Sequence, residues 1–262
     1  MNNFRAFINS IPPVVKNILA INIILWLATI ATPGIFMRFG INAKLEDFLG
    51  MHYWASDKFS PAQMFTYMFM HANFMHMFFN MFAVYMFGAA LESLWGPKRF
   101  LFYYILTGIG AAVVQQLFWT VEYQPLVTAM NEAISANSGQ VLVPFEGELM
   151  KYFRLSNLQA FDATALLEMK TMFVNAPITV GASGAVFGLL LAFGWLFPQA
   201  ELFMMFIPVP IKARVAVTIY AVVELFFGVA GFSGDNIAHF AHLGGMLFGI
   251  IIMLFWQKKR FR

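Results

Sequence analysis

Long apolar runs recur along the 262-residue chain and alternate with short polar segments. A helix needs roughly 20 apolar residues to cross the hydrocarbon core of a bilayer. Six segments meet this requirement: Asn17–Phe36, Met75–Leu94, Phe100–Trp119, Thr179–Phe197, Ala213–Ala230 and Ile237–Trp256. The pattern therefore predicts an all-α, polytopic membrane protein with six transmembrane helices.

The composition supports the same conclusion. Hydrophobic residues make up 60% of the chain and charged residues 11%, whereas soluble domains average about 45–50% and about 25%. So few charges cannot cover the surface of a soluble globule, which excludes an ordinary soluble enzyme and a disordered chain. The absence of cysteine also excludes disulfides, thiolate nucleophiles and thiolate metal sites.

The basic residues indicate an orientation rather than a nucleic-acid partner. Six crossings place both termini on one side, and 10 of the 16 lysines and arginines lie in short segments on that side: Arg5, Lys16, Lys98, Arg99, Lys212, Arg214, Lys258, Lys259, Arg260 and Arg262. Lys and Arg in short loops hold those loops in the cytoplasm. We therefore expect both termini to be cytoplasmic and expect no binding of nucleic acid.

Two longer loops interrupt the pattern. Residues 37–74 are half apolar, which predicts a loop that lies in the interface or folds back into the protein. Residues 121–178 carry apolar side chains at helical spacing, which predicts an amphipathic helix resting on the membrane or on the bundle; these are Leu158, Phe161, Ala165, Met169 and Met172. We expect one membrane domain over residues 1–262 with an extended outer insert at 121–178.

Ser183 stands apart from the other serines because it lies inside an apolar run, at the outer start of the fourth span. Gly181 and Gly184 flank it and allow a sharp turn and the close approach of another chain. The first N–H groups of a helix lack intrahelical partners and can stabilise an oxyanion. The alternative is a Gly/Ser face that serves only helix packing.

His242 lies on a stripe of small residues in the sixth span, since Ala238, Gly245 and Gly249 share its helix face. The fourth span carries a matching stripe of Gly184 and Gly188. Contact between these two faces would bring Ser183 Oγ near the His242 ring, where histidine can take and return the serine proton. The alternative is a packing histidine bonded to a carbonyl group.

A second polar group lies in the outer half of the second span. His76 and Asn80 are four residues apart and share a helix face, and His71 precedes them in the loop. Their N–H groups suit a developing oxyanion, although interhelical hydrogen bonding alone is the alternative. No HExxH motif occurs, and no carboxylate pairs with these histidines at a usual spacing. We expect neither a metal nor a cofactor.

Four segments together resemble the rhomboid intramembrane serine proteases. His71-Ala72-Asn73-Phe74-Met75-His76-Met77-Phe78-Phe79-Asn80 is similar to the family's His…His-x-x-x-Asn region, and Glu92-x-x-x-Gly96-Pro97-x-Arg99-Phe100 to the turn that follows it. Gly181-Ala182-Ser183-Gly184 matches the G-x-S-G motif, and Ala241-His242-x-x-Gly245 matches A-H-x-x-G. The ordered set covers spans two to six.

The resemblance implies a role for each of these residues. Ser183 is the nucleophile and His242 its general base, in a dyad without an acid. The oxyanion hole consists of His76, Asn80 and the Ser183 N–H, with backbone from Gly181, while His71 supports the outer loop. The substrates are single-span membrane proteins, and the location is the bacterial plasma membrane. The oligomeric state stays open, and the alternative is an inactive relative that binds transmembrane segments.

Three positions depart from the family pattern or leave it ambiguous. Trp54 is followed by Ala55, where the family often has a Trp-Arg pair. Glu224 lies inside the fifth span. One interpretation is that it faces the cavity or the first outer loop and serves packing alone. The second hypothesis is a role at a substrate gate. His239 also follows an alanine, but Gly245 lies at the motif's spacing from His242, which favours His242 as the base.

Overall fold

The computed structural model describes residue 6 and residues 8–153, 158–203, 209–230 and 237–260. Within these residues, five helices are long and apolar enough to cross a membrane, and a sixth apolar helix is shorter. The prediction of an all-α polytopic membrane protein is confirmed. Arg5 and Arg262, which contributed to the charge argument, lie outside the described residues.

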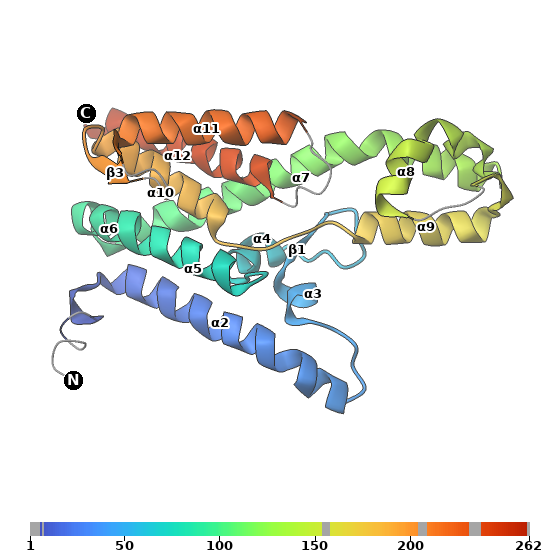
Figure 1. The fold of residues 1–262 in the computed structure, drawn as a ribbon, viewed down its shortest axis with the longest axis horizontal. Helices are drawn as coiled ribbons and strands as arrows, with labels where there is room; N and C mark the ends of the chain where they lie inside the picture. Colours follow the sequence, from blue (N-terminus) through green and yellow to red (C-terminus); the bar gives the residue numbers. More distant parts are fainter. Residues whose placement is uncertain (1–5, 7, 154–157, 204–208, 231–236, 261–262) are drawn as a thin grey trace.

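In the part of the chain that the structure describes, helices follow one another with four short strands between them. In order they are α2 (Pro13–Arg38), α3 (Leu45–Leu49), β1 (Met51–His52), α4 (Gln63–Thr66), η1 (Tyr67–Phe69), α5 (Phe74–Ala83), η2 (Val84–Gly88), α6 (Ala89–Trp95), α7 (Pro97–Ser135), η3 (Gly139–Phe145), α8 (Glu146–Tyr152), η4 (Leu158–Ala160), α9 (Ala163–Asn175), β2 (Ile178–Thr179), α10 (Ser183–Leu196), β3 (Glu201–Phe203), β4 (Pro210–Lys212), α11 (Ala213–Ala230) and α12 (His239–Arg260). Elements α5, η2 and α6 form one continuous span. The first turn of α2 and the end of α12 lie at the same end of the molecule (Figure 1).

Two predicted boundaries are wrong. The fourth span was expected from Thr179, but α10 begins at Ser183 because Ile178 and Thr179 pair as a strand with the first loop. The loop expected from residue 121 begins instead as helix, since α7 continues to Ser135. Hydropathy marks the end of the apolar run, whereas the backbone hydrogen bonds of α7 continue beyond it.

Helix α10 packs between α7 and α12 through small residues. A Cβ on Gly188 would lie 2.7 Å from Thr107 Cβ, and one on Gly184 would lie 2.5 Å from Ala111 Cβ. A Cβ on Gly245 would overlap the carbonyl group of Gly184. The small faces of the fourth and sixth spans therefore meet at backbone contact, as the glycine pattern predicts.

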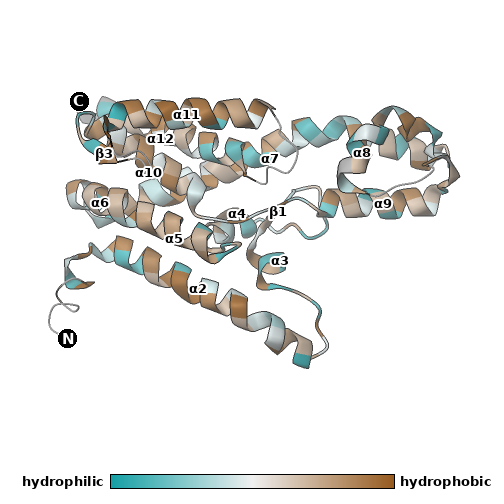
Figure 2. Ribbon diagram, in the orientation of Figure 1, coloured by the Kyte–Doolittle hydropathy of each residue, from teal (hydrophilic) through white to brown (hydrophobic). Residues whose placement is uncertain are grey.

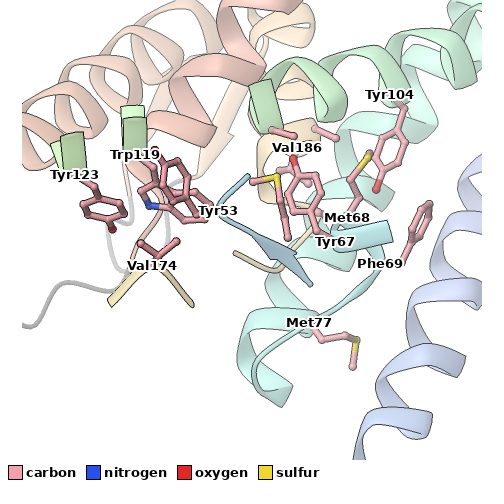
Figure 3. Close-up of a cluster of buried hydrophobic side chains, with 14 of the residues drawn as sticks. Tyr53, Tyr67, Met68, Phe69, Met77, Tyr104, Trp119, Tyr123, Val174 and Val186 are labelled. Atoms are coloured by element: carbon pink, nitrogen blue, oxygen red, sulfur yellow. The ribbon is translucent and has the colours of Figure 1, made fainter. Parts of the chain in front are cut away.

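The first loop folds back into the protein. Tyr67, Met68 and Met70 are fully or almost fully buried, and Figure 3 shows Tyr67 and Met68 beside the bundle helices. Tyr67 Oη donates to the Gly108 carbonyl at 2.8 Å, and the Tyr67 carbonyl accepts from Gly181 N at 2.9 Å. The loop therefore connects α7 to the turn that precedes α10.

The insert extends beyond the bundle on the second half of α7 (Figure 1), where Figure 2 shows more polar residues than on the bundle helices. Its amphipathic helix α9 buries Leu166, Met169 and Phe173, which pack toward α7. The predicted stripe was partly wrong: Met169 lies on the buried face, but Met172 is 61% exposed. The buried face follows from contact with α7, which the apolar spacing alone could not locate.

The start of α2 is tied to the end of α6 by one carboxylate. Glu92 is buried, and its two oxygens accept hydrogen bonds from Val14 N at 2.9 Å and Val15 N at 2.8 Å. The first N–H groups of a helix have no partner within the helix and attract negative charge. Glu92 thereby fixes α2 to the bundle, while most of the rest of that helix is exposed to its surroundings.

Candidate active site

The turn before α10 sets the position of Ser183. Gly181 has a φ of +128°, a conformation that L side chains rarely adopt, and a Cβ there would lie 2.7 Å from the ring of His76. Ala182 then leads into α10, whose first residue is Ser183. The glycine is therefore required both for the backbone conformation and for the approach of α5.

Ser183 and His242 lie opposite each other across the α10–α12 contact. The distance from Ser183 Oγ to His242 Nε2 is 2.8 Å, a hydrogen-bond distance. The ring of Phe187, one turn after Ser183, stacks on the His242 ring with centroids 4.2 Å apart and planes 7° apart. Phe187 thus fixes the plane of the imidazole and keeps Nε2 directed at the serine.

A carboxylate lies behind His242. Glu224 on α11 is 8% exposed, and its Oε2 lies 2.6 Å from His239 Nδ1 and 2.9 Å from His242 Nδ1. The His239 contact is a hydrogen bond, whereas the angle at His242 is too bent to count as one. The resemblance implied a pair without an acid; here α11 brings an acid within ion-pair distance of the histidine.

His76 lies next to the serine, whereas Asn80 is engaged elsewhere. A Cβ on Gly181 would be 2.7 Å from His76 Nε2 and 3.7 Å from Ser183 Oγ, so the imidazole and the hydroxyl border the same glycine. Asn80 Nδ2 donates instead to the His76 carbonyl at 2.9 Å in its own helix. The structure therefore brings His76 to Ser183 but does not direct the Asn80 amide toward it.

His71 supports His76 from the end of the first loop. It is fully buried, and its ring meets the His76 ring edge-on with centroids 5.1 Å apart. Burial, with a smaller contribution from His76, lowers the pKa of His71 to about 3. Within the described residues neither ring nitrogen has a hydrogen-bond partner, so the ring is held neutral by packing.

Two features of this site were not predicted from the sequence. Phe187 could have been found, because it lies four residues after Ser183 and therefore on the same helix face. The grouping of Glu224 with two histidines could not, because it depends on how α11 packs on α12. Among the described residues, Glu224, His239 and His242 are the group whose side chains could hold a metal ion.

Comparison with known proteins identifies the family of the chain. Residues 58–259 match the family model described as the Rhomboid domain. The protein "Rhomboid protein 1, mitochondrial" of Saccharomyces cerevisiae is 26% identical over 185 residues, which cover 70% of this chain and 38% of that protein. The chain therefore matches well under half of the length of this relative. Since the family model spans most of the chain, from the first loop to the end of α12, the chain belongs to the rhomboid family.

Proposed function

We propose that this chain is an intramembrane serine endopeptidase that hydrolyses peptide bonds in or near transmembrane segments. The observation that carries the proposal is the 2.8 Å separation of Ser183 Oγ and His242 Nε2, on two helices in backbone contact. A serine this close to an imidazole can transfer its proton as it attacks a carbonyl carbon. Membership of the rhomboid family supports the same class of reaction.

In the first half-reaction, Ser183 Oγ attacks the scissile carbonyl carbon while His242 Nε2 takes its proton. The oxyanion that forms is stabilised by the Ser183 N–H at the start of α10 and by the neighbouring His76 ring. Asn80 joins them once its amide leaves the His76 carbonyl. His242 then gives the proton to the leaving amine, which produces an acyl-enzyme and a new amino terminus.

In the second half-reaction, His242 removes a proton from water, whose oxygen attacks the acyl carbon. Collapse of this second tetrahedral intermediate returns the proton to Ser183 Oγ and releases the carboxyl product. Glu224 acts as a positioning residue, because its carboxylate near Nδ1 favours the tautomer with the proton on Nδ1. That tautomer leaves Nε2 free to accept the serine proton.

The wider setting extends the same proposal. We infer that residues 1–262 form one membrane domain carrying the insert at 121–178, with both termini cytoplasmic. The substrates are single-span membrane proteins, and the membrane is the plasma membrane of a bacterium. Helix α10 is short and apolar and begins at Ser183. Its short length supports a site that is open to the outer side, from which substrate and water arrive.

The test is labelling of the purified, detergent-solubilised full chain with a fluorophosphonate probe, together with cleavage of a model single-span substrate. Wild type should be labelled and should cleave, and Ser183→Ala and His242→Ala should do neither. Ser135→Ala, at an exposed serine on α7, is the matched control and should behave as wild type. A folded wild type that neither reacts nor cleaves contradicts the proposal and favours a non-proteolytic membrane-binding role.

A further inference from the structure

The side chains behind Ser183 form a compact set of metal-ligating atoms. Glu224, His239 and His242 each offer one ligand atom within 4.8 Å of the other two, and all three residues are buried. His239 and His242 are three residues apart on α12 and share one face, which α11 covers with Glu224. Ionisable groups are costly inside a membrane and mark candidate functional sites, even where they pair with one another as these do.

One atom of this set is poorly satisfied by the protein itself. His242 Nδ1 is buried and makes no hydrogen bond of acceptable angle, although Glu224 Oε2 lies 2.9 Å away. Buried polar atoms are ordinarily hydrogen-bonded or bound to an ion. Within the described residues, His242 Nδ1 is therefore the atom of this set that is open to a ligand.

The donor types select the ligand. Two histidines and one glutamate are a known ligand set for Zn²⁺, with water at the fourth position and metal–ligand distances of about 2.0–2.2 Å. Ligands at those distances around a tetrahedral ion are roughly 3.4 Å apart. Glu224 Oε2 lies 2.6 Å from His239 Nδ1 and 2.9 Å from His242 Nδ1. Each of these two distances must therefore widen by under about 1 Å, which side-chain rotation can provide.

We propose that Glu224, His239 and His242 form an inhibitory site for a divalent transition-metal ion, with Zn²⁺ the best match. The binding half of this inference stands on geometry alone, and the inhibitory half rests on the proposed protease function. Nothing in the site requires the ion for the reaction. Occupancy instead removes the general base from the reaction.

The inhibition follows from the two nitrogens of His242. Without the ion, Nδ1 carries the ring proton and Nε2 accepts the proton of Ser183. An ion on the Nδ1 lone pair leaves the neutral ring with its proton on Nε2, which then donates to Ser183 Oγ instead. His239 shifts its proton from Nδ1 to Nε2 in the same way, so both rings stay neutral and no net proton is released.

Binding is tested first, on the Ser183→Ala full chain, so that the result does not depend on activity. Cobalt(II) serves as the probe, because its visible absorption reports tetrahedral coordination, and Zn²⁺ should displace it. His239→Gln and Glu224→Gln should each weaken Co²⁺ binding by at least about 100-fold. Glu168→Gln, at an exposed carboxylate on α9, is the control and should bind as the parent does.

Inhibition is tested next, on wild type cleaving a model single-span substrate. Stoichiometric Zn²⁺ should stop cleavage, and a chelator should restore it. Inhibition of each protein is measured against its own metal-free rate. The Zn²⁺ concentration for half inhibition should then be at least tenfold higher for His239→Gln than for wild type. Absence of a tetrahedral Co²⁺ spectrum overturns the proposal. Equal sensitivity of His239→Gln and wild type to Zn²⁺ also overturns it, by placing the inhibitory ion elsewhere.

The two proposals fail in different ways. If Ser183→Ala binds Co²⁺ through these three residues but wild type never cleaves or reacts with the probe, the protease function is wrong and the metal site stands. If wild type cleaves but Ser183→Ala shows no binding, the metal site is wrong and the protease stands. Thermal unfolding without metal identifies any variant that has simply failed to fold.

Discussion

Gly245→Ala should separate the two helices that hold Ser183 and His242. A Cβ at this position would overlap the carbonyl oxygen of Gly184 and lie 2.8 Å from the carbonyl carbon. Ordinary contact begins at 3.4 Å, so the helices must part by at least 3.4 − 2.8 = 0.6 Å at the carbon and by more at the oxygen. The obstacle is backbone, which cannot rotate away as a side chain does.

The displacement acts directly on the proposed reaction, because Gly184 follows Ser183 and Gly245 lies one turn after His242. Adding 0.6 Å to the present 2.8 Å between Oγ and Nε2 already reaches the limit of a hydrogen bond. A misplacement of about 1 Å costs roughly 100-fold in rate. We therefore expect about a 100-fold loss of substrate turnover, with an overpacking cost of about 1–3 kcal/mol in stability.

The assay measures the rates of probe labelling and substrate cleavage. The temperature is one at which the thermal unfolding curve of the variant shows that it is still folded. Gly34→Ala is the control. Gly34 lies in α2, another membrane helix, and a Cβ there would have nothing within 4 Å. This variant should leave both rates unchanged. A folded Gly245→Ala with wild-type turnover would refute the reasoning, because the close approach of α10 and α12 would then not determine the serine–histidine distance.

Three further changes have defined outcomes. Glu92→Gln weakens the charge-assisted bonds to Val14 and Val15 and should lower the free energy of unfolding by about 1–2 kcal/mol in a denaturant titration, whereas no loss would mean that Glu92 does not hold α2. His71 has a folded-state pKa of about 3 against an ordinary 6.5, so the unfolded chain binds more protons between these values, and stability should fall by about 1.4 kcal/mol per unit as pH drops below 6.5. His71→Asn should flatten this dependence, and an unchanged slope would exclude His71 as its source. Phe173→Ala removes a fully packed ring from the insert and should cost about 3–5 kcal/mol, measured as faster proteolytic nicking there, while probe labelling of Ser183 persists; loss of both would show that insert and site unfold together.

The fold was largely predictable from sequence because lipid imposes a simple rule on helix length. That rule located the helices, but it could not locate their ends where polar residues continue a helix. Glu122 and Gln124 end the apolar run without ending α7, since hydrogen bonding inside a helix does not depend on side-chain polarity. On α9 the apolar spacing was compatible with more than one buried face. Contact with α7 determines that the buried face is the one that includes Phe173.

The candidate site divides in the same way. Ser183 and His242 could be paired in advance because each lies on a stripe of small residues, and such stripes attract one another in membranes. The partner of Glu224 could not be identified, because the spacing between residues 224 and 242 does not fix how α11 rotates against α12. The orientation of the Asn80 amide was equally hidden, since it depends on a rotamer choice between its own helix and the site.

The length of α7 has a mechanical consequence. Its 39 residues extend for about 58 Å at the usual rise per residue, about twice the roughly 30 Å of hydrocarbon. The same rod therefore carries the insert at one end and packs against α10 and α12 at the other. A tilt of about 5° in the projecting part would move the insert by roughly 2 Å, so a load on the insert exerts torque on the bundle. Pro125 interrupts the backbone hydrogen bonds inside α7 and is therefore the position at which this helix can bend.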